Sequence, residues 1–225
     1  MLFFRMNRTV CTLLAAVTLA AGVAGCATPV VLGGAALGGM MIIDRRTVGT
    51  QVDDETIELR SVNRVHGAYG DKVHINVTSY NRQVLLTGEV PSAEVREGIE
   101  KIVAGVENVR SVVNDLAVMP NTSIGQRSND TFITGKVRAS LVDAKDLSAS
   151  SFKVVTERNV VYLMGLVTQR EAGRATAIAR GVTGVSKVVR VFEYLTDDDL
   201  ARMNASPRRS APVTQDNVET SVPVR

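Results

Sequence analysis

An internal repeat constrains the fold of this chain more than any single motif does. Residues 84–88 (VLLTG) are echoed 77 positions later by residues 161–165 (VYLMG), and residues 105–109 (GVENV) are echoed 76 positions later by residues 181–185 (GVTGV). Two matched landmarks with nearly the same offset are the signature of a duplication. The repeated unit is about 65 residues long, which is too long for a solenoid repeat and suits a small domain. The sequence therefore predicts two tandem domains of one fold.

Both copies begin with the same order of predicted elements. A helix is expected near residues 54–65 and again at 130–142. A strand follows at residues 73–77 (VHINV), in which apolar and polar side chains alternate as in a strand with one buried face. Its counterpart is the strand predicted at residues 152–156 (FKVVT). Asparagines then mark the turn to a second strand in each copy, because Asn tolerates left-handed backbone conformations.

Glycines punctuate the second half of each copy. In the first copy Gly88 is predicted to end the second strand and Gly105 the second helix, and in the second copy Gly165 and Gly181 do the same. The spacing of Thr168 and Glu171 predicts a capping box at the start of one of these helices. A third strand closes each unit, at residues 109–118 and 185–195. The predicted fold class is α+β, with two domains in the order helix–strand–strand–helix–strand, each a three-stranded mixed sheet with helices on one face.

The N-terminus has the pattern of a secretory signal peptide. Arg5 and Arg8 precede an apolar run at residues 10–24, which is too short for a stable transmembrane helix. The run ends in Val-Ala-Gly-Cys, which resembles the lipobox of bacterial lipoproteins. This resemblance implies cleavage after Gly25, a diacylglycerol on the Cys26 thiol and an acyl chain such as palmitate on the new amine. The alternative is an ordinary secreted protein with a free N-terminal cysteine.

The lipobox resemblance also implies a location. The residue after the cysteine is Ala27, and not the aspartate that retains lipoproteins at the inner membrane of enteric bacteria. The expected location is the periplasmic face of the outer membrane. The expected segments are a signal peptide at 1–25, a lipidated tether at 26–50, a first domain at 51–119, a linker at 120–128, a second domain at 129–196 and a disordered tail at 197–225.

The first helix of the second copy carries two different faces. Asn129 or Asp130 is predicted to cap a helix that begins near Thr131. Ile133, Val137 and Leu141 then form one stripe at helical spacing and are predicted to face the core. Phe132 lies well off this stripe, with Gly135 and Ala139 beside it and with Lys136 and Arg138 at the rim.

An exposed aromatic ring next to two cations suits the boundary of an anionic membrane. The predicted phospholipid-binding residues are therefore Phe132, Gly135, Lys136, Arg138 and Ala139. The alternative is that another domain of the protein covers Phe132.

Residues 105–113 and 181–189 share the pattern Gly-Val, Val and Val-Val at the same spacing. This pattern and the order of elements resemble the BON domain. Together with the lipobox, several strings resemble dual-BON outer-membrane lipoproteins of the DolP (YraP) type, and the similarity covers roughly residues 20–195. These strings are residues 48–54 (VGTQVDD), 128–131 (SNDT), 136–138 (KVR) and 164–168 (MGLVT). The membrane-dipping aromatic of that family is typically Trp, and Phe132 occupies the matching position here.

The family resemblance implies a non-enzymatic function. The second BON domain is expected to bind anionic phospholipid, such as phosphatidylglycerol or cardiolipin, through its first helix. The protein is expected to gather at division sites and to support outer-membrane integrity. The alternative function is a protein-interaction module that serves the outer-membrane β-barrel assembly machinery or cell-wall enzymes.

Several kinds of chemistry have no support in the sequence. The formal charge of +3 falls to +1 once Arg5 and Arg8 leave with the signal peptide, which gives no case for nucleic-acid binding. Cys11 and Cys26 both precede the predicted domains, and His66 and His74 are assigned to a loop and to the outward face of a strand. No metal site, no cofactor and no catalytic residues are predicted, and the chain is not expected to be an enzyme.

Overall fold

The computed structural model describes residues 44–205. The predicted signal peptide, the lipidated Cys26 and most of the tether lie outside these residues, as does the tail beyond residue 205. Within the described residues, no helix combines the length and the apolar composition needed to cross a membrane.

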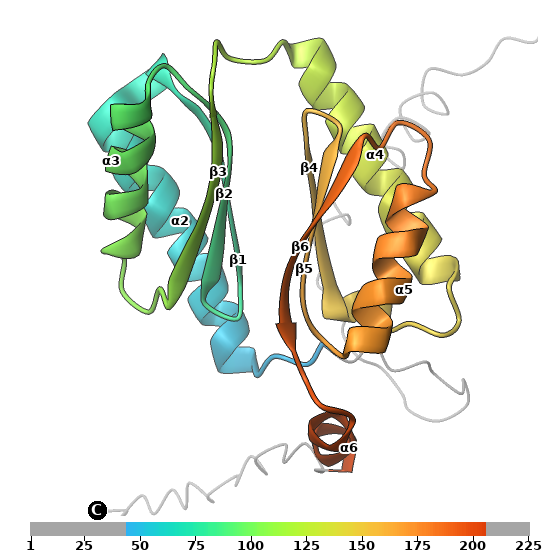
Figure 1. Cartoon of the computed structure of the whole chain (residues 1–225). Helices are drawn as coiled ribbons and strands as arrows, with labels where there is room; N and C mark the ends of the chain where they lie inside the picture. The colour runs from blue at the N-terminus through green and yellow to red at the C-terminus, as the bar shows by residue number, and fades with distance from the viewer. Residues whose placement is uncertain (1–43, 206–225) are drawn as a thin grey trace, which may run out of the picture. The chain divides into compact units, whose positions relative to one another are not determined.

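The first domain contains two helices and three strands (Figure 1). Helix α2 (Val48–Tyr69) is followed by the short 3-10 helix η2 (Gly70–Lys72) and by strands β1 (His74–Tyr80) and β2 (Gln83–Val90). Helix α3 (Ala93–Ala104) then connects β2 to β3 (Ser111–Val118). The order helix–strand–strand–helix–strand is the one that the sequence predicts.

The second domain repeats this order. Helix α4 (Ile124–Asp143) leads through the 3-10 helix η3 (Ala149–Ser151) to β4 (Phe152–Glu157) and β5 (Val160–Val167). Helix α5 (Gln169–Arg180) precedes β6 (Lys187–Tyr194), and helix α6 (Asp197–Ala205) follows the domain. The duplication inferred from the repeated strings is thus confirmed at the level of the fold.

Each sheet is mixed and has the middle strand of the sequence at its centre. Strand β2 pairs antiparallel with β1 and parallel with β3, with Leu86 opposite Val77 on one side and Asn114 on the other. Strand β5 pairs in the same way with β4 and β6. Helices α2 and α3 lie on one face of the first sheet, and α4 and α5 on one face of the second (Figure 1). The predicted α+β fold class is confirmed.

Each domain closes a core between its sheet and its two helices. In the second domain Ile133, Val137 and Leu141 of α4 are buried against β4, β5 and α5, as their spacing predicts. In the first domain Ile57 and Val65 of α2 occupy the corresponding positions. Successive strand residues point to opposite faces, so that alternate residues of β2 and β5 face these cores.

Residues on the opposite faces of the two sheets build a third apolar cluster that joins the two domains. Tyr80 and Leu85 of the first domain pack with Tyr162, Met164 and Val191 of the second. The Tyr162 hydroxyl also donates a hydrogen bond of 2.6 Å to Asp115. This contact explains why β2 and β5 are apolar on both faces.

The predicted starts of the two long helices were wrong. The cap of α4 is Ser123, whose hydroxyl accepts a hydrogen bond from the Gln126 amide, and not Asn129 or Asp130. Helix α4 therefore begins inside the predicted linker. Likewise α2 begins at Val48, within the predicted tether, and extends to Tyr69, so that His66 lies on a helix and not in a loop.

Asp130 is buried because it organises the turn between β4 and β5. Its carboxylate accepts hydrogen bonds from the backbone amides of Arg158 at 2.9 Å and Asn159 at 2.8 Å. Both residues have positive φ, at 51° and 60°, and the carboxylate holds this left-handed turn in place. In the first domain Asp54 accepts from Asn81 and Arg82 in the same manner.

The second strands continue past the glycines that were predicted to end them. Gly88 has φ of 119°, and a Cβ there would lie 2.1 Å from the carbonyl oxygen of His74. A Cβ at Gly165 would lie 2.4 Å from the carbonyl oxygen of Ser151. These glycines permit a close approach of the neighbouring chain and do not terminate the strand.

The ends of the other elements agree with the sequence more closely. Thr168 and Glu171 form the predicted capping box at the start of α5, and Gly105 and Gly181 are the C-caps of α3 and α5. The tail predicted to be disordered from residue 197 begins instead with α6. Thr196 caps this helix, because its hydroxyl accepts from the Asp199 amide and the Asp199 carboxylate accepts from the Thr196 amide.

Candidate functional site

The outer face of α4 is an apolar stripe without a partner in the described part of the chain. Ile124, Phe132 and Val142 on this face are 81%, 66% and 69% exposed. At about 100° of rotation per residue these three lie opposite the core stripe of Ile133 and Val137. The stripe runs from the first to the last turn of the helix, about 27 Å at 1.5 Å per residue.

Phe132 is the largest side chain on this stripe, and its neighbours are small. Gly135 and Ala139 are also exposed, and no atom lies within 4 Å of where a Cβ of Gly135 would be. The ring therefore stands clear of the helix surface. The alternative in which another domain covers Phe132 was wrong for residues 44–205, because the domains meet through their sheets instead.

Two cations border the stripe on opposite sides. The Nζ of Lys136 lies 4.9 Å from the centroid of the Phe132 ring and donates a hydrogen bond to the carbonyl oxygen of Thr183. On the other side Arg138 is exposed, and its Nη2 donates to the carbonyl oxygen of Val154 at 3.3 Å. The structure thus brings together all five residues predicted from the sequence, on one face of one helix.

The polar side chains of the same face are turned back onto the helix. The hydroxyl of Ser128 donates to the carbonyl oxygen of Ile124 at 2.9 Å, and that of Thr131 donates to the carbonyl oxygen of Arg127 at 3.0 Å. A hydroxyl that is satisfied in this way needs no water as an acceptor. The face is therefore less polar than its composition indicates.

Ile124 and Val142 also belong to this face, although the sequence did not predict them there. Ile124 falls within the predicted linker, because the predicted helix has its cap at Asn129 or Asp130. The pattern Ser123-x-x-Gln126 is the signal that could have found the true start, since Ser followed three residues later by Gln is typical of a helix N-terminus.

Helix α2 of the first domain carries a comparable stripe with a different charge. Val48, Val52, Leu59 and Val62 are exposed on its outer face, and the exposed Glu55 lies among them. Leu59 is 64% exposed, nearly as much as Phe132. The stripe on α2 thus carries the acidic Glu55 where α4 has Thr131, and Arg60, at the position of Lys136, forms an ion pair with Glu107.

Comparison with known proteins identifies the two repeated units. The family model described as "BON domain" matches residues 53–120 and residues 129–196. These two matches together cover more than half of the chain and coincide with the two sheets and their helices.

Three curated relatives resemble the chain over most of their own length. An outer membrane lipoprotein named DolP from Haemophilus influenzae is 39% identical over 173 residues, which cover 76% of this chain and 89% of the relative. A 21 kDa hemolysin from Actinobacillus pleuropneumoniae is 34% identical over 68% of this chain and 80% of its own. Osmotically-inducible protein Y from Escherichia coli is 32% identical over 63% of this chain and 72% of its own.

Proposed function

We propose a function from the premise that this chain belongs to the BON-domain family and, within it, to the DolP-like outer-membrane lipoproteins. The protein is anchored by acyl chains on Cys26 to the periplasmic face of the outer membrane. It binds anionic phospholipid, such as phosphatidylglycerol or cardiolipin, through the outer face of α4. Its role is to support outer-membrane integrity, including at division sites, and it is not enzymatic.

One observation carries this proposal. Phe132 is two-thirds exposed, and Lys136 and Arg138 lie on either side of the stripe to which it belongs. Burial of a Phe side chain is worth ~1.5–3 kcal/mol, and each cation close to an anionic surface adds ~1 kcal/mol. One ring and two cations therefore supply a weak contact, which suits a protein that its acyl chains already hold at the membrane.

The geometry of α4 also favours a helix that lies along the membrane surface. An interfacial helix presents an apolar face to the acyl boundary and keeps its charges at the level of the headgroups. Ile124, Phe132 and Val142 would enter this boundary together, because they share one face over the full length of the helix. The opposite face stays packed in the domain core, so that docking requires no unfolding.

A vesicle co-sedimentation assay tests the proposal. We expect Phe132→Glu to weaken binding of the unlipidated Cys26→Ala protein to phosphatidylglycerol-rich vesicles at least tenfold, because a carboxylate then faces an anionic surface. The matched control is Leu59→Glu, an equally exposed position on the corresponding helix of the first domain. Both variants should melt like the parent protein. Equal binding by the two variants would place the lipid contact elsewhere.

A second candidate function rests on the stripe of α2. Four exposed apolar side chains on one face of a helix are typical of protein–protein contact sites. Glu55 makes this face unsuitable for an anionic membrane, so the stripe supports the alternative in which the first domain binds a protein partner, such as a component of the outer-membrane assembly machinery. If Leu59→Glu impairs function in cells while lipid binding is intact, this second candidate gains support.

A further inference from the structure

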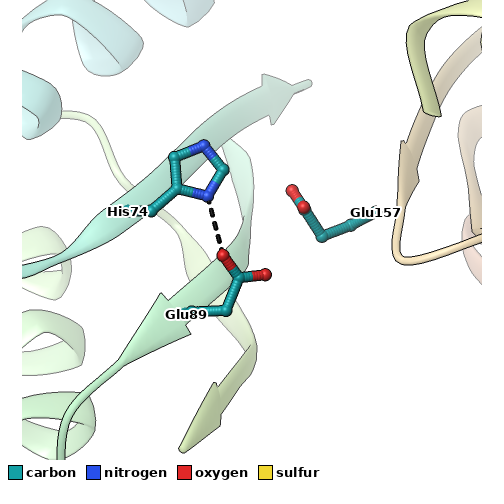
Figure 2. Close-up of side chains that lie close together, drawn as sticks. All are labelled: His74, Glu89 and Glu157. Carbon is teal, nitrogen blue, oxygen red and sulfur yellow. Dashed lines mark hydrogen bonds and ion pairs between the residues drawn. The ribbon is translucent and has the colours of Figure 1, made fainter. Parts of the chain in front are cut away.

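A histidine and two glutamates meet where the first domain contacts the second. His74 on β1 and Glu89 on β2 are directly opposite in the antiparallel pair, and Glu157 reaches toward them from the end of β4 (Figure 2). One ligand atom from each of the three side chains lies within 4.8 Å of those of the other two. Glu89 is fully buried, Glu157 is 2% exposed and the His74 side chain is 17% exposed.

Each carboxylate is already held in place by neighbours that leave it facing the cluster. Oε1 of Glu89 accepts a hydrogen bond from Arg158 at 2.8 Å, and Oε2 accepts from the amide and hydroxyl of Thr122 at 3.1 and 3.0 Å. Oε2 of Glu157 accepts from the Asn76 side-chain amide at 2.7 Å. Outer hydrogen bonds of this kind orient the ligands in metal sites.

The charges of the cluster do not balance without a further cation. Arg158 pairs with Glu89, but no positively charged side chain in the described part of the chain forms an ion pair with Glu157. An ionised carboxylate that is buried without a counter-charge is strongly unfavourable. The cluster therefore needs either a proton, on Glu157 or on His74, or a metal ion.

We propose that His74, Glu89 and Glu157 form a binding site for one divalent transition-metal ion of the Zn²⁺ type. Imidazole nitrogen with carboxylate oxygen is a ligand set that Zn²⁺ accepts, whereas Ca²⁺ and Mg²⁺ prefer oxygen ligands alone. The Nδ1 of His74 lies 2.9 Å from Oε2 of Glu89, and the metal takes the place of the proton between them. Binding thus exchanges a proton for a divalent cation.

A neighbouring cavity gives the ion a route and leaves room for water ligands. This cavity has a volume of about 420 Å³ and is open to solvent. His74, Asn76 and Glu157 line it, together with threonine side chains of β1, α4 and β4. Three protein ligands with open positions on the solvent side are typical of zinc sites that also bind water. Because the ligands come from both domains, the ion strengthens the contact between them.

A Zn²⁺ titration followed by histidine NMR tests the proposal on the full chain in detergent. Cys11 and Cys26 are replaced by Ser, since their thiols would compete for the ion. The chain has two histidines, so each ring can be followed separately. We expect the ring signals of His74 to change until one equivalent of Zn²⁺ has been added, and those of His66, exposed on α2, to stay unchanged.

Affinity measured by competition with a chromophoric chelator gives the second readout. His74→Ala and Glu157→Gln should each weaken Zn²⁺ binding at least tenfold, whereas His66→Ala should bind like the parent. Binding that survives His74→Ala would overturn the proposal. Measurements on the parent chain also test the proposal. An absence of saturable Zn²⁺ binding, or a change in the ring signals of His66 in place of those of His74, would contradict it.

Discussion

Phe132 and Ile133 are adjacent in the chain yet meet opposite surroundings, because α4 turns about 100° per residue. Ile133 is buried among core residues, and Phe132 projects outward beside Lys136. The sequence was sufficient to predict this division, since it follows from helical phase alone. It was not sufficient to predict the cluster of His74, Glu89 and Glu157, because Glu157 is far from the other two in the chain and meets them only through the contact between domains.

The ionisation of Glu157 leads to a prediction of how the stability of the protein depends on pH. Burial raises the pKa of Glu157, and the nearby charge of Glu89 adds to the shift. The folded protein therefore holds this proton more tightly than the unfolded chain does, and it loses stability as pH rises from the ordinary carboxyl pKa through the raised one. With chelator present, Glu157→Gln should melt higher than the parent protein at neutral pH, and the difference should vanish near about pH 4.

Glu89, the other carboxylate of the cluster, supplies the control. Although burial opposes it, hydrogen bonds from Thr122 and Arg158 lower the pKa of Glu89. Glu89 thus contributes stability above the ordinary carboxyl pKa and loses it as pH falls through the lowered one. Glu89→Gln should melt lower than the parent at neutral pH. Thermal melts across the pH range check both variants, and a Glu157→Gln protein that is destabilised at neutral pH would contradict the account.

At the scale of elements, the duplication fixes most of the fold. In both copies the same arrangement of three strands packs against a first helix. A buried aspartate of that helix, Asp54 or Asp130, holds the turn between the first and second strands. The sequence predicted the order of elements because strands and helices differ in apolar period. It misplaced the start of α4 because Asp130 resembles an N-cap, whereas its carboxylate is directed at a turn that is distant in sequence.

A pair of adjacent substitutions separates these two roles of the α4 segment. Asp130→Ala removes the acceptor of two backbone amides in the turn at Arg158 and Asn159 and should destabilise the protein by ~3 kcal/mol. Asn129→Ala removes only an exposed hydrogen bond of 2.8 Å to the side chain of Asn159 and should cost less than ~1 kcal/mol. Chemical denaturation measures both. A larger loss for Asn129→Ala than for Asp130→Ala would contradict the role given to the Asp130 carboxylate in this turn.

At the scale of the whole molecule, two closed cores are joined by a third cluster. The continuous apolar runs at residues 84–86 and 161–164 are buried on both faces of the central strands. The sequence could not show what covers the second face, since a helix or another sheet would produce the same pattern. Tyr80 and Leu85 on one side and Tyr162 and Met164 on the other provide the answer.

The closed cores predict that one domain can fold without the other. Residues 121–196 retain the whole core of the second domain, including Ile133 and Leu163, and should unfold cooperatively. This fragment exposes Tyr162, Met164 and Val191, so its melting temperature should be at least ~5 °C lower than that of the full chain. Calorimetry of the fragment and the full chain makes the comparison. A fragment without a cooperative transition would show that the two domains form a single folding unit.

The central claim is that the outer face of α4 contacts an anionic membrane. The most direct measurement is a map of backbone amide shifts in the protein from residue 44 onward as phosphatidylglycerol-containing micelles are added. We predict that the largest changes follow the outer face of α4, at Ile124, Phe132, Gly135, Ala139 and Val142, and that α2 is unaffected. The central claim is contradicted if the amides of α4 do not change, or if the changes follow Val52 and Leu59 on α2 instead.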